Sequence, residues 1–369
     1  MSDTEFPFAD ELGPARVVHL YEPALDLRAV VVVDNVAAGP AIGGVRMAPD
    51  VSTEECFRLA RAMTLKNAAA ELPHGGGKSV IFGDPKIEPA AKERIVRAFA
   101  SMIAELDDYI PGPDMGTDET CMAWIRDETG RSVGLPRELG GIPLDTIGAT
   151  GFGLAVAIDT AKNDCSLTLD GARIAVQGFG AVGIHVTRAL TARGARLVAV
   201  SDSAGTLTEM SGLDVDALIA LKRSGGKVTD APFGEKLARD AVIEADCDVL
   251  VPAARPDVIT VENAPRVKAR LIAQGANIPA TAEAEAVLHE RGILSLPDFI
   301  ANAGGVICAS VEYHGGSESQ AFATIEERIG RNTRAVLDLA RERRLMPRVA
   351  ARALVDERLR RLAGYRRWR

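Results

Sequence analysis

The chain has few cysteines, and they form no pattern that indicates a cross-link or a metal site. Only five occur among 369 residues, they are scattered, and no two form a CxxC pair: Cys56, Cys121, Cys165, Cys247 and Cys308. Disulfide frameworks and zinc sites normally show an even number of cysteines or closely spaced pairs. We therefore expect reduced, mostly buried thiols and no metal.

Long apolar runs and an excess of positive charge are also missing. No uninterrupted apolar stretch approaches the ~18 residues of a membrane-spanning helix. The acidic start, MSDTEFPFADELG, lacks the basic and then apolar character of a signal peptide. The net charge is −8, so the total charge does not attract nucleic acid or an anionic membrane. These absences predict a soluble, cytoplasmic protein with no nucleic-acid or membrane partner.

Residues 63–78, MTLKNAAAELPHGGGK, are the most informative segment that the chain does contain. Ser52 and Glu55 form a capping box, and a stripe of inward residues with helical spacing follows, on which Lys66 falls. A lysine that leaves water needs an anion to stay charged, so Lys66 favours a carboxylate ligand. The alternative is that Lys66 reaches solvent from a frayed helix end.

A second lysine, Lys78, follows Pro73 and three glycines. Pro73 ends the helix, and residues 75–77 let the backbone approach a ligand closely and adopt positive φ. An ordinary turn is the alternative. A phosphate-binding loop of the GxxxxGK[ST] type is excluded, because Leu72 occupies the position of its first glycine. Two lysines in one apolar site indicate amine chemistry.

The order of expected elements indicates two α/β domains. Strands at 27–33 and 80–82 alternate with helices at 52–72 and 90–106. A stretch rich in glycine and proline, residues 134–153, is typical of a linker, with the boundary near Pro143.

After the linker, a helix at 153–161 precedes a series of continuous apolar strands, which is the pattern of a doubly wound parallel sheet. The strands are expected at 173–177, 197–201, 248–251, 270–273 and 293–296. We expect domains at 1–143 and 144–328, and C-terminal helices at 329–369 that pack back on the first domain.

A dinucleotide fingerprint, GxGxxG, lies between the expected strand at 173–177 and the next helix. Its residues are Gly178, Phe179, Gly180, Ala181, Val182 and Gly183. The glycines permit a tight turn, close approach to a pyrophosphate and helix packing. Asp202, 24 residues past Gly178, is placed to accept ribose hydroxyls, which favours NAD over NADP. Because Ser201 and Ser203 flank Asp202, NADP stays open, as does a purely structural turn.

Asp114 lies between Pro113 and Met115 in the loop YIPGPDMGT, residues 109–117. We expect it on a stiff, exposed turn. A capping or turn role is the alternative to a catalytic one.

Taken together, these segments resemble the glutamate, leucine, phenylalanine and valine dehydrogenases over nearly the whole chain. Eight motifs match in order: GPAIGGVRM, MTLKNA, GGGK, PGPDMGT, GATGFG, VQGFGAVG, QGAN and ANAGGV. The resemblance implies an α/β substrate domain with a mixed sheet, a Rossmann-type NAD domain, cleft closure and a homo-oligomer.

The resemblance also implies residue roles. Lys66 binds the substrate α-carboxylate, Lys78 is the catalytic lysine, and Asp114 shuttles protons. Lys66 and a dry cleft lower the pKa of Lys78, so that it acts as a base. Asn277 and Asn302 position nicotinamide and substrate, and Thr150 lies near the carboxamide.

The side-chain pocket favours an apolar amino acid. Glutamate enzymes of the family carry a lysine before two glycines and a serine after AGGV, whereas this chain has Ile42 before Gly43 and Gly44, and Ala309. Met63 is expected at the same pocket. We expect a leucine, valine or phenylalanine type of substrate. Glutamate is the alternative, because VSDSAGTL, GLDVDAL and VEY resemble the glutamate branch and Arg46 is a candidate substitute cation.

Two further classes compete with this interpretation. A 2-hydroxy acid dehydrogenase would use a histidine as acid and base, and only His74 and His314 fall near the motifs. A nucleotide-binding regulator would have lost catalysis, and the presence of Lys66, Lys78 and Asp114 argues against it.

Overall fold

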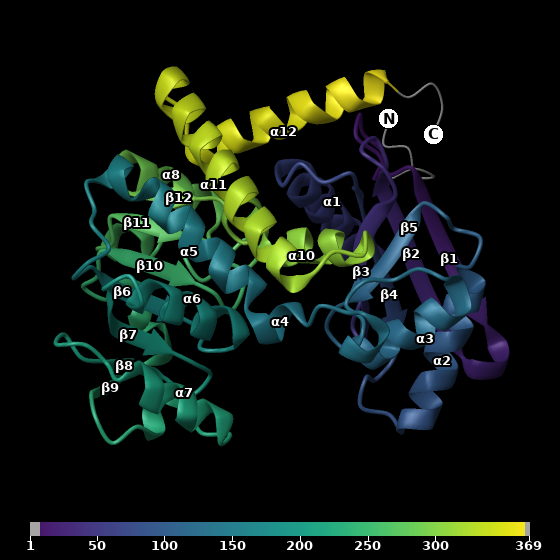
Figure 1. Ribbon diagram of the computed structural model, residues 1–369, viewed down its shortest axis with the longest axis horizontal. Coiled ribbons are helices and arrows are strands. Elements are labelled where there is room, and N and C mark those ends of the chain that lie inside the picture. The colour runs from purple at the N-terminus through teal and green to yellow at the C-terminus, as the bar shows by residue number, and fades with distance from the viewer. Residues whose placement is uncertain (1–7, 366–369) are drawn as a thin grey trace. The chain divides into compact units, whose positions relative to one another are not determined.

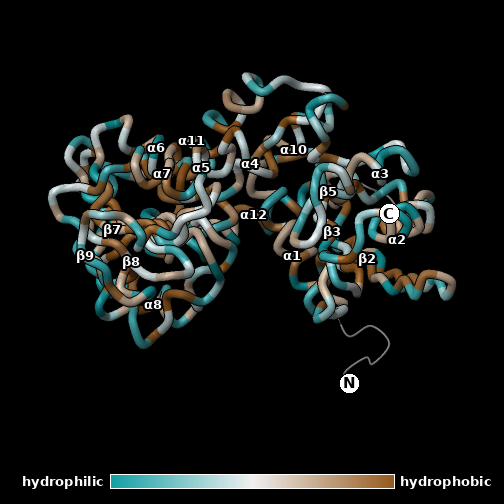
Figure 2. The backbone as a smooth tube through the Cα atoms, turned by 90° about the horizontal axis from the view of Figure 1, so that it is seen from below, coloured by the Kyte–Doolittle hydropathy of each residue, from teal (hydrophilic) through white to brown (hydrophobic). Residues whose placement is uncertain are grey.

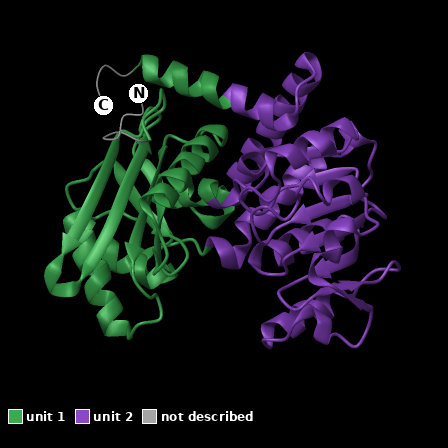
Figure 3. Ribbon diagram, turned by 180° about the vertical axis from the view of Figure 1, so that it is seen from behind, with its two compact units in different colours: residues 1–143, 306–321, 355–369 green, residues 144–305, 322–354 purple. Residues whose placement is uncertain are grey.

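The computed structural model describes residues 8–365 (Figure 1), so the first seven residues of the acidic start lie outside the described chain. The protein divides into two compact units, drawn in green and purple in Figure 3. Unit 1 comprises residues 1–143, 306–321 and 355–369, and unit 2 comprises 144–305 and 322–354. Within residues 8–365, no helix has both the length and the apolar character needed to cross a membrane.

Unit 1 is built on a five-stranded mixed sheet, as the resemblance implies, with the order β1-β2-β4-β3-β5. β1 pairs with β2, and β2 with β4, in antiparallel fashion, whereas β3 is parallel to both β4 and β5. Its strands are β1 (Arg16–Glu22), β2 (Leu27–Asn35), β3 (Ala41–Ala48), β4 (Gly75–Phe82) and β5 (Tyr109–Pro113). The expected strand at 27–33 corresponds to β2 and is an inner strand, because β1 pairs with its other side.

Alternation along β2 explains how both faces of this sheet are covered. Val30 and Val32 pack in one apolar cluster with residues of α1 (Thr53–Ala69). Val31 and Val33 point the other way, into a larger cluster with α2 (Pro89–Met102) and α3 (Glu119–Thr129). Side chains of a strand alternate between faces, so a strand buried on both sides is apolar throughout.

The glycine run before Lys78 is extended strand rather than a turn, which corrects the expectation for residues 75–77. None of the three has a positive φ. They are needed because the chain is crowded: a Cβ on Gly76 would lie 2.0 Å from the backbone nitrogen of Thr64 in α1, and one on Gly75 would lie 1.7 Å from the carbonyl oxygen of Asn35. Glycine therefore lets α1 and β2 pack directly on the backbone of β4.

Unit 2 is built on a seven-stranded sheet in the order β12-β11-β10-β6-β7-β8-β9. The five strands from β12 to β7 are parallel, as expected, and β8 and β9 extend the sheet antiparallel at one end. The strands are β6 (Arg173–Gln177), β7 (Arg196–Ser201), β8 (Thr206–Thr208), β9 (Glu235–Leu237), β10 (Val249–Pro252), β11 (Leu271–Ala273) and β12 (Leu294–Leu296).

Helices cover this second sheet, and its strands are hydrophobic, as the brown trace at β7 shows (Figure 2). One apolar cluster joins the strands to the 3-10 helices η5 (Arg239–Glu244) and η6 (Ala264–Arg266) and to α8 (Ala282–Glu290). The remaining helices after the linker are α4 (Leu144–Ile147), α5 (Ala149–Ala161), α6 (Ala181–Thr191), α7 (Val215–Arg223), α9 (Asp298–Ala301), α10 (Gly304–Tyr313), α11 (Glu318–Arg343) and α12 (Pro347–Gly364).

Replacing Gly76 by alanine should lower the free energy of unfolding by about 3 kcal/mol, because the new methyl group must push α1 away from β4. Urea denaturation followed by circular dichroism measures the loss. Gly364→Ala is the matched control, since a Cβ there meets nothing within 4 Å. Equal stability of the two variants would contradict the packing argument.

Candidate active site

Strand register in unit 1 brings the candidate residues of β3 and β4 onto one face of the sheet. Arg46 lies opposite Val80, and Val80 packs in the cluster that contains α1. Because side chains alternate, Lys78 on β4, and Ile42 and Gly44 on β3, share that face. The chemistry-bearing residues therefore lie on the α1 side of the sheet, although they are up to 36 positions apart in the chain.

Asp114 is the centre of an ionic contact on this face. Its Oδ2 accepts a hydrogen bond from Lys78 Nζ, and its Oδ1 accepts from Arg46 Nε at 2.8 Å and from the backbone of Met115 at 2.7 Å. Its side chain is 19% exposed. The expected turn forms, because the backbone nitrogen of Thr117 donates to the carbonyl oxygen of Asp114. The expected exposure is wrong, since Asp114 follows the end of β5 with two cations against it.

The same contact explains the acidity of both catalytic candidates. Lys78 is only 4% exposed, and burial lowers its pKa from the ordinary value, partly opposed by Asp114 and reinforced by Arg46. Burial raises the pKa of Asp114, but Lys78 and Arg46 outweigh this and hold the pKa below its ordinary value. Burial thus makes Lys78 easier to deprotonate than an exposed lysine, while the two cations keep Asp114 ionised.

Arg46 is the residue of this site whose role the sequence argument missed. Its Nη1 donates to Glu55 Oε1 at 2.5 Å while its Nε holds Asp114. Ser52 accepts a hydrogen bond from the backbone of Glu55, so half of the expected capping box forms, and the Glu55 carboxylate turns to Arg46 instead. No spacing rule joins positions 46, 55 and 114, which explains why the contact was not anticipated.

Gly43 and Gly44 leave room for the lysine and the aspartate. A Cβ on Gly44 would lie 2.8 Å from Asp114 Oδ2 and 3.0 Å from Lys78 Nζ. A Cβ on Gly43 would lie 1.7 Å from the carbonyl oxygen of Gly77. Gly44 therefore keeps the reactive groups accessible, and Gly43 allows β3 to pair closely with β4.

Lys66 and Met63 lie on α1, the helix that covers this face, and both are half-buried. The helix is fixed to the sheet by Asn67, which donates to the carbonyl oxygen of Gly75 at 2.6 Å, and by Thr64, which donates to Asp34 at 2.5 Å. Lys66 is in the last turn of α1. Its role toward a substrate carboxylate stays a prediction.

Ile42 and Ala309, the two residues on which the substrate argument depends, belong to one apolar cluster. Ile110 and Val133 complete it, and all four side chains are buried. Glu312 holds the segment that follows Val133, because its carboxylate accepts hydrogen bonds from the backbones of Gly134, Leu135 and Ile142. The cluster therefore combines two strands, a loop and α10.

His74 is a core residue. It is 2% exposed and packs against the rings of Tyr313 and His314. Burial, with a contribution from His314, lowers the pKa of His74 to about 4. Such a group is neutral near pH 7 and is a poor general acid, which weakens the 2-hydroxy acid alternative.

The fingerprint loop of unit 2 has the glycine roles expected of a dinucleotide site. Gly178 has a φ of 94°. A Cβ on Gly183 would lie 1.9 Å from the carbonyl oxygen of Gly178, whereas one on Gly180 would meet nothing within 4 Å. Phe179 is buried beneath the loop. The turn, the helix packing and the open approach at Gly180 fit a pyrophosphate, with Ala181 and Val182 beginning α6.

Asp202 follows β7 as expected, but its carboxylate is largely engaged. Oδ2 accepts from Lys222 Nζ at 2.7 Å and from the backbone of Val228 at 3.0 Å, and Oδ1 accepts from the backbone of Ala204 at 2.9 Å. Burial raises the pKa of Asp202, yet these donors hold it below the ordinary value. The positive charge of Lys222 offsets the negative charge of Asp202, which would otherwise repel the 2′-phosphate of NADP.

Asn302 offers the clearest unused hydrogen-bonding group in the described part of unit 2. Its Nδ2 donates to the carbonyl oxygens of Gly275 and Ala276 and to Asn277 Oδ1, while its buried Oδ1 has no partner among the described residues. An orphaned acceptor beyond the sheet fits an amide donor of a nicotinamide group. Thr150, at the start of α5, is half-buried and faces Gly305, at the start of α10.

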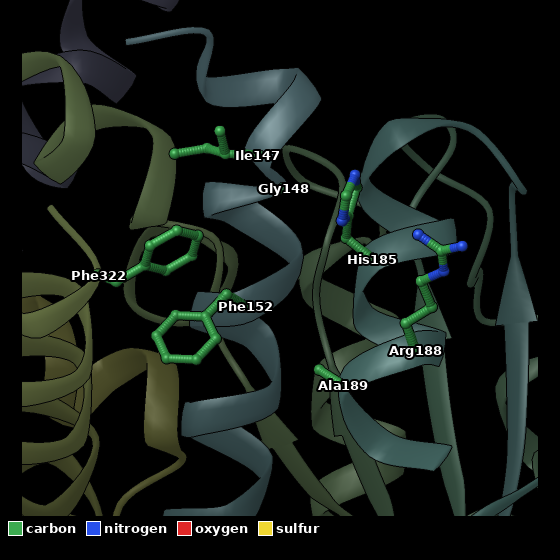
Figure 4. Close-up of a pocket in the computed structure, with 7 residues that line it drawn as sticks. All are labelled: Ile147, Gly148, Phe152, His185, Arg188, Ala189 and Phe322. Atoms are coloured by element: carbon green, nitrogen blue, oxygen red, sulfur yellow. The ribbon is translucent and has the colours of Figure 1, made fainter. Parts of the chain in front are cut away.

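A hollow elsewhere in unit 2 does not coincide with these residues. It has a volume of about 250 Å³ and is seen in Figure 4. It is lined by Ile147, Gly148, Phe152, His185, Arg188, Ala189 and Phe322. None of the expected cofactor residues lines it, so it carries no argument for the dinucleotide.

Two family models match the chain. Residues 22–131 match "Glu/Leu/Phe/Val dehydrogenase, dimerisation domain", and residues 140–364 match "Glutamate/Leucine/Phenylalanine/Valine dehydrogenase".

Similar curated proteins carry the name glutamate dehydrogenase. One from Aeropyrum pernix is 38% identical and covers 90% of this chain and 85% of its own. An NADP-specific enzyme from Saccharolobus shibatae is 40% identical, with 76% and 69% covered. An NAD-specific enzyme from Staphylococcus aureus is 36% identical, with 90% and 85% covered. These names differ from the expectation of a pocket like that of leucine, phenylalanine or valine enzymes, because all three relatives are glutamate dehydrogenases.

Solved structures agree on the fold. A hetero-hexameric glutamate dehydrogenase from Thermus thermophilus, in a leucine-bound form, has a TM-score of 0.85 and 34% identity, with 96% of this chain and 89% of the other covered. An L-tryptophan dehydrogenase from Nostoc punctiforme has a TM-score of 0.72 and 27% identity, with 95% and 97% covered.

Replacing Arg46 by methionine should raise the pKa of Asp114, because one of the two cations that lower it is removed. The carboxyl carbon of selectively labelled aspartate, followed by NMR during a pH titration and assigned by its loss in Asp114→Asn, reports the shift. Arg97→Met is the control, since Arg97 holds Glu93, Asp127 and Glu128 on the surface. An unchanged titration of Asp114 in Arg46→Met would show that the guanidinium does not act on it.

Proposed function

The chain belongs to the glutamate/leucine/phenylalanine/valine dehydrogenase family and is an NAD(P)-dependent amino acid dehydrogenase, and we propose that its substrate is an L-amino acid with an apolar side chain. The reaction is reversible oxidative deamination, which consumes the amino acid, water and oxidised dinucleotide and yields a 2-oxo acid, ammonia, reduced dinucleotide and a proton. The observation that carries the substrate class is the burial of Ile42 and Ala309 in one apolar cluster.

Proton transfer is assigned to Asp114 and Lys78. The amino group of the substrate must lose a proton before hydride can leave Cα, and the ionised Asp114 accepts it. Lys78, in the neutral form that burial and Arg46 favour by lowering its pKa, then takes a proton from the water that attacks the imine carbon. Their direct hydrogen bond lets the two groups exchange the proton between steps.

Substrate binding is assigned to Lys66 through the α-carboxylate. A charged lysine on α1 gives the carboxylate a partner as it leaves water, which would otherwise cost several kcal/mol. The pairing of β3 with β4 puts the Lys78 side chain on the face of the sheet that α1 covers, which supports a site between this helix and the sheet.

NAD is the proposed cofactor, and it supplies the hydride acceptor. Residues 178–183, Asn277, Asn302 and Thr150 would hold it, as the resemblance implies. The retained Asp202 supports NAD, whereas its engagement by Lys222 weakens discrimination against NADP. The named relatives include both an NAD-specific and an NADP-specific enzyme.

Glutamate is the second candidate substrate, and the names of the similar proteins favour it over an apolar one. The side chains of the pocket favour an apolar substrate instead. A γ-carboxylate placed against Ile42 and Ala309 would meet the apolar side chains of their cluster, and Arg46 is already engaged by Glu55 and Asp114. We weight these contacts over overall similarity, because substrate choice depends on the pocket and not on the scaffold.

A homo-oligomer is the proposed assembly. One matching family model is described as a dimerisation domain, which supports self-association, and the similar Thermus thermophilus structure is a hetero-hexamer.

A panel of L-amino acids, followed by NADH absorbance, tests the substrate. We expect kcat/KM for leucine, valine or phenylalanine to exceed that for glutamate by about a hundredfold, because the uncompensated carboxylate is rejected. NADP in place of NAD is run in parallel. The double variant Ile42→Lys/Ala309→Ser should reduce this difference in kcat/KM, because it gives the γ-carboxylate polar partners. Ile42→Met, of similar volume, should leave the difference unchanged. A clear preference of the wild type for glutamate would refute the apolar assignment and leave the proton-transfer assignment intact.

A further inference from the structure

Arg348, in the first turn of α12, makes three charge-assisted or polar contacts within unit 2. Its Nε donates to Glu285 Oε2 at 2.6 Å, and its Nη2 donates to Gln274 Oε1 at 2.8 Å and to Asp298 Oδ1 at 2.9 Å. Its guanidinium also lies over the ring of Phe299, 5.5 Å from the centroid. A planar guanidinium can hold such partners at once in fixed directions, which a lysine cannot do.

Two of these partners stand at opposite ends of the loop that follows β11, residues 274–278. Gln274 begins the loop, and its Nε2 donates to Glu285 at 2.5 Å and to Ser295 at 3.1 Å. Asp298 closes it, because its second oxygen accepts a hydrogen bond from the backbone of Ile278 at 2.9 Å. A single nitrogen of Arg348 therefore connects both ends of the loop.

The backbone at Ile278, the C-terminal end of this loop, is strained and needs a hydrogen bond to hold it. Ile278 has a φ of 49°, a left-handed conformation that a β-branched residue rarely adopts. A strained backbone of this kind persists only where its surroundings over-determine it. The Asp298 carboxylate supplies the hydrogen bond that holds Ile278, and Arg348 fixes the direction of that carboxylate from its other oxygen.

The loop also carries the groups that face the proposed cofactor. Asn302 donates to the carbonyl oxygens of Gly275 and Ala276 and to the side chain of Asn277. A shift of the loop would move these three acceptors and, with them, the orphaned Oδ1 of Asn302. The geometry of the proposed nicotinamide site therefore depends on the loop.

Removal of Arg348 is expected to displace the loop, because two of its partners are nearly buried carboxylates. The side chains of Glu285 and Asp298 are each 7% exposed, and Gln274 is fully buried. Loss of Arg348 would leave two nearly buried carboxylates without their shared cation, a strongly unfavourable state. We expect both carboxylates to turn toward water, which releases Ile278 and Gln274.

We propose that Arg348 is a positioning residue of the dinucleotide site, which holds the loop 274–278 in its binding conformation through Gln274 and Asp298. The proposal rests on the proposed function only in that a dinucleotide binds beyond this sheet. It assigns a part in cofactor binding to the C-terminal segment of the chain, 70 positions beyond Ile278, where no motif indicated one.

Binding of NADH, measured by the enhancement of its fluorescence, tests the proposal independently of turnover. Arg348→Met should weaken NADH binding about tenfold, since a small displacement of binding groups has a large effect, and should raise KM for NAD while leaving KM for the amino acid within about twofold. Arg348→Lys should recover part of the loss. Asp298→Asn should weaken binding in the same direction, and the double variant should add little to Arg348→Met, because the two residues act through one contact.

Arg334→Met is the matched control. Arg334 lies in the same C-terminal segment of unit 2 and holds Asp164 and the carbonyl oxygen of Thr160, away from the loop. If Arg348→Met bound NADH as tightly as the wild type, or lost no more than Arg334→Met at a similar melting temperature, Arg348 would be merely structural. A wild-type protein that bound no NADH would instead contradict the dinucleotide site, and the proposal with it.

Discussion

The contact between Lys78, Asp114 and Arg46 is the constraint on which the active-site account depends. Burial disfavours a charged amine, and two cations beside one carboxylate make that carboxylate hard to protonate. The protein builds this arrangement from three neighbouring strands by leaving glycine at position 44 and by packing α1 on the glycines of β4. The packing of β3, β4 and α1 therefore brings these three groups together at a largely buried position.

Unit 2 uses the same physical device for a different purpose. Arg348 neutralises two nearly buried carboxylates and orients them toward a strained loop, as Arg46 orients Asp114. In both units an arginine fixes the direction of a largely buried carboxylate in or near the proposed site. The guanidinium suits this work because it remains charged when buried and holds several acceptors in fixed directions.

Much of the fold was predictable, because continuous apolar runs and the helix at 52–72 depend on local patterns. The strands β1, β3 and β5 were missed, and glycine in β3 and glycine with proline in β5 obscure their periodicity. Motifs indicated Lys78, Asp114 and the fingerprint glycines as candidates. The contacts of Arg46, Glu312, Lys222 and Arg348 were not predicted, because each of these residues holds a partner that no local pattern joins to it. The glycines before Lys78 were misinterpreted, because their need for close packing is visible only in three dimensions.

The most direct test of the account is the turnover of Lys78→Ala beside its binding of NADH. We predict that turnover falls by about a thousandfold, the range typical of a lost general base, while NADH binding is unchanged because the fingerprint loop is untouched. A variant that retained near wild-type turnover would show that the buried amine does not perform the proton transfer, and the central claim would be wrong.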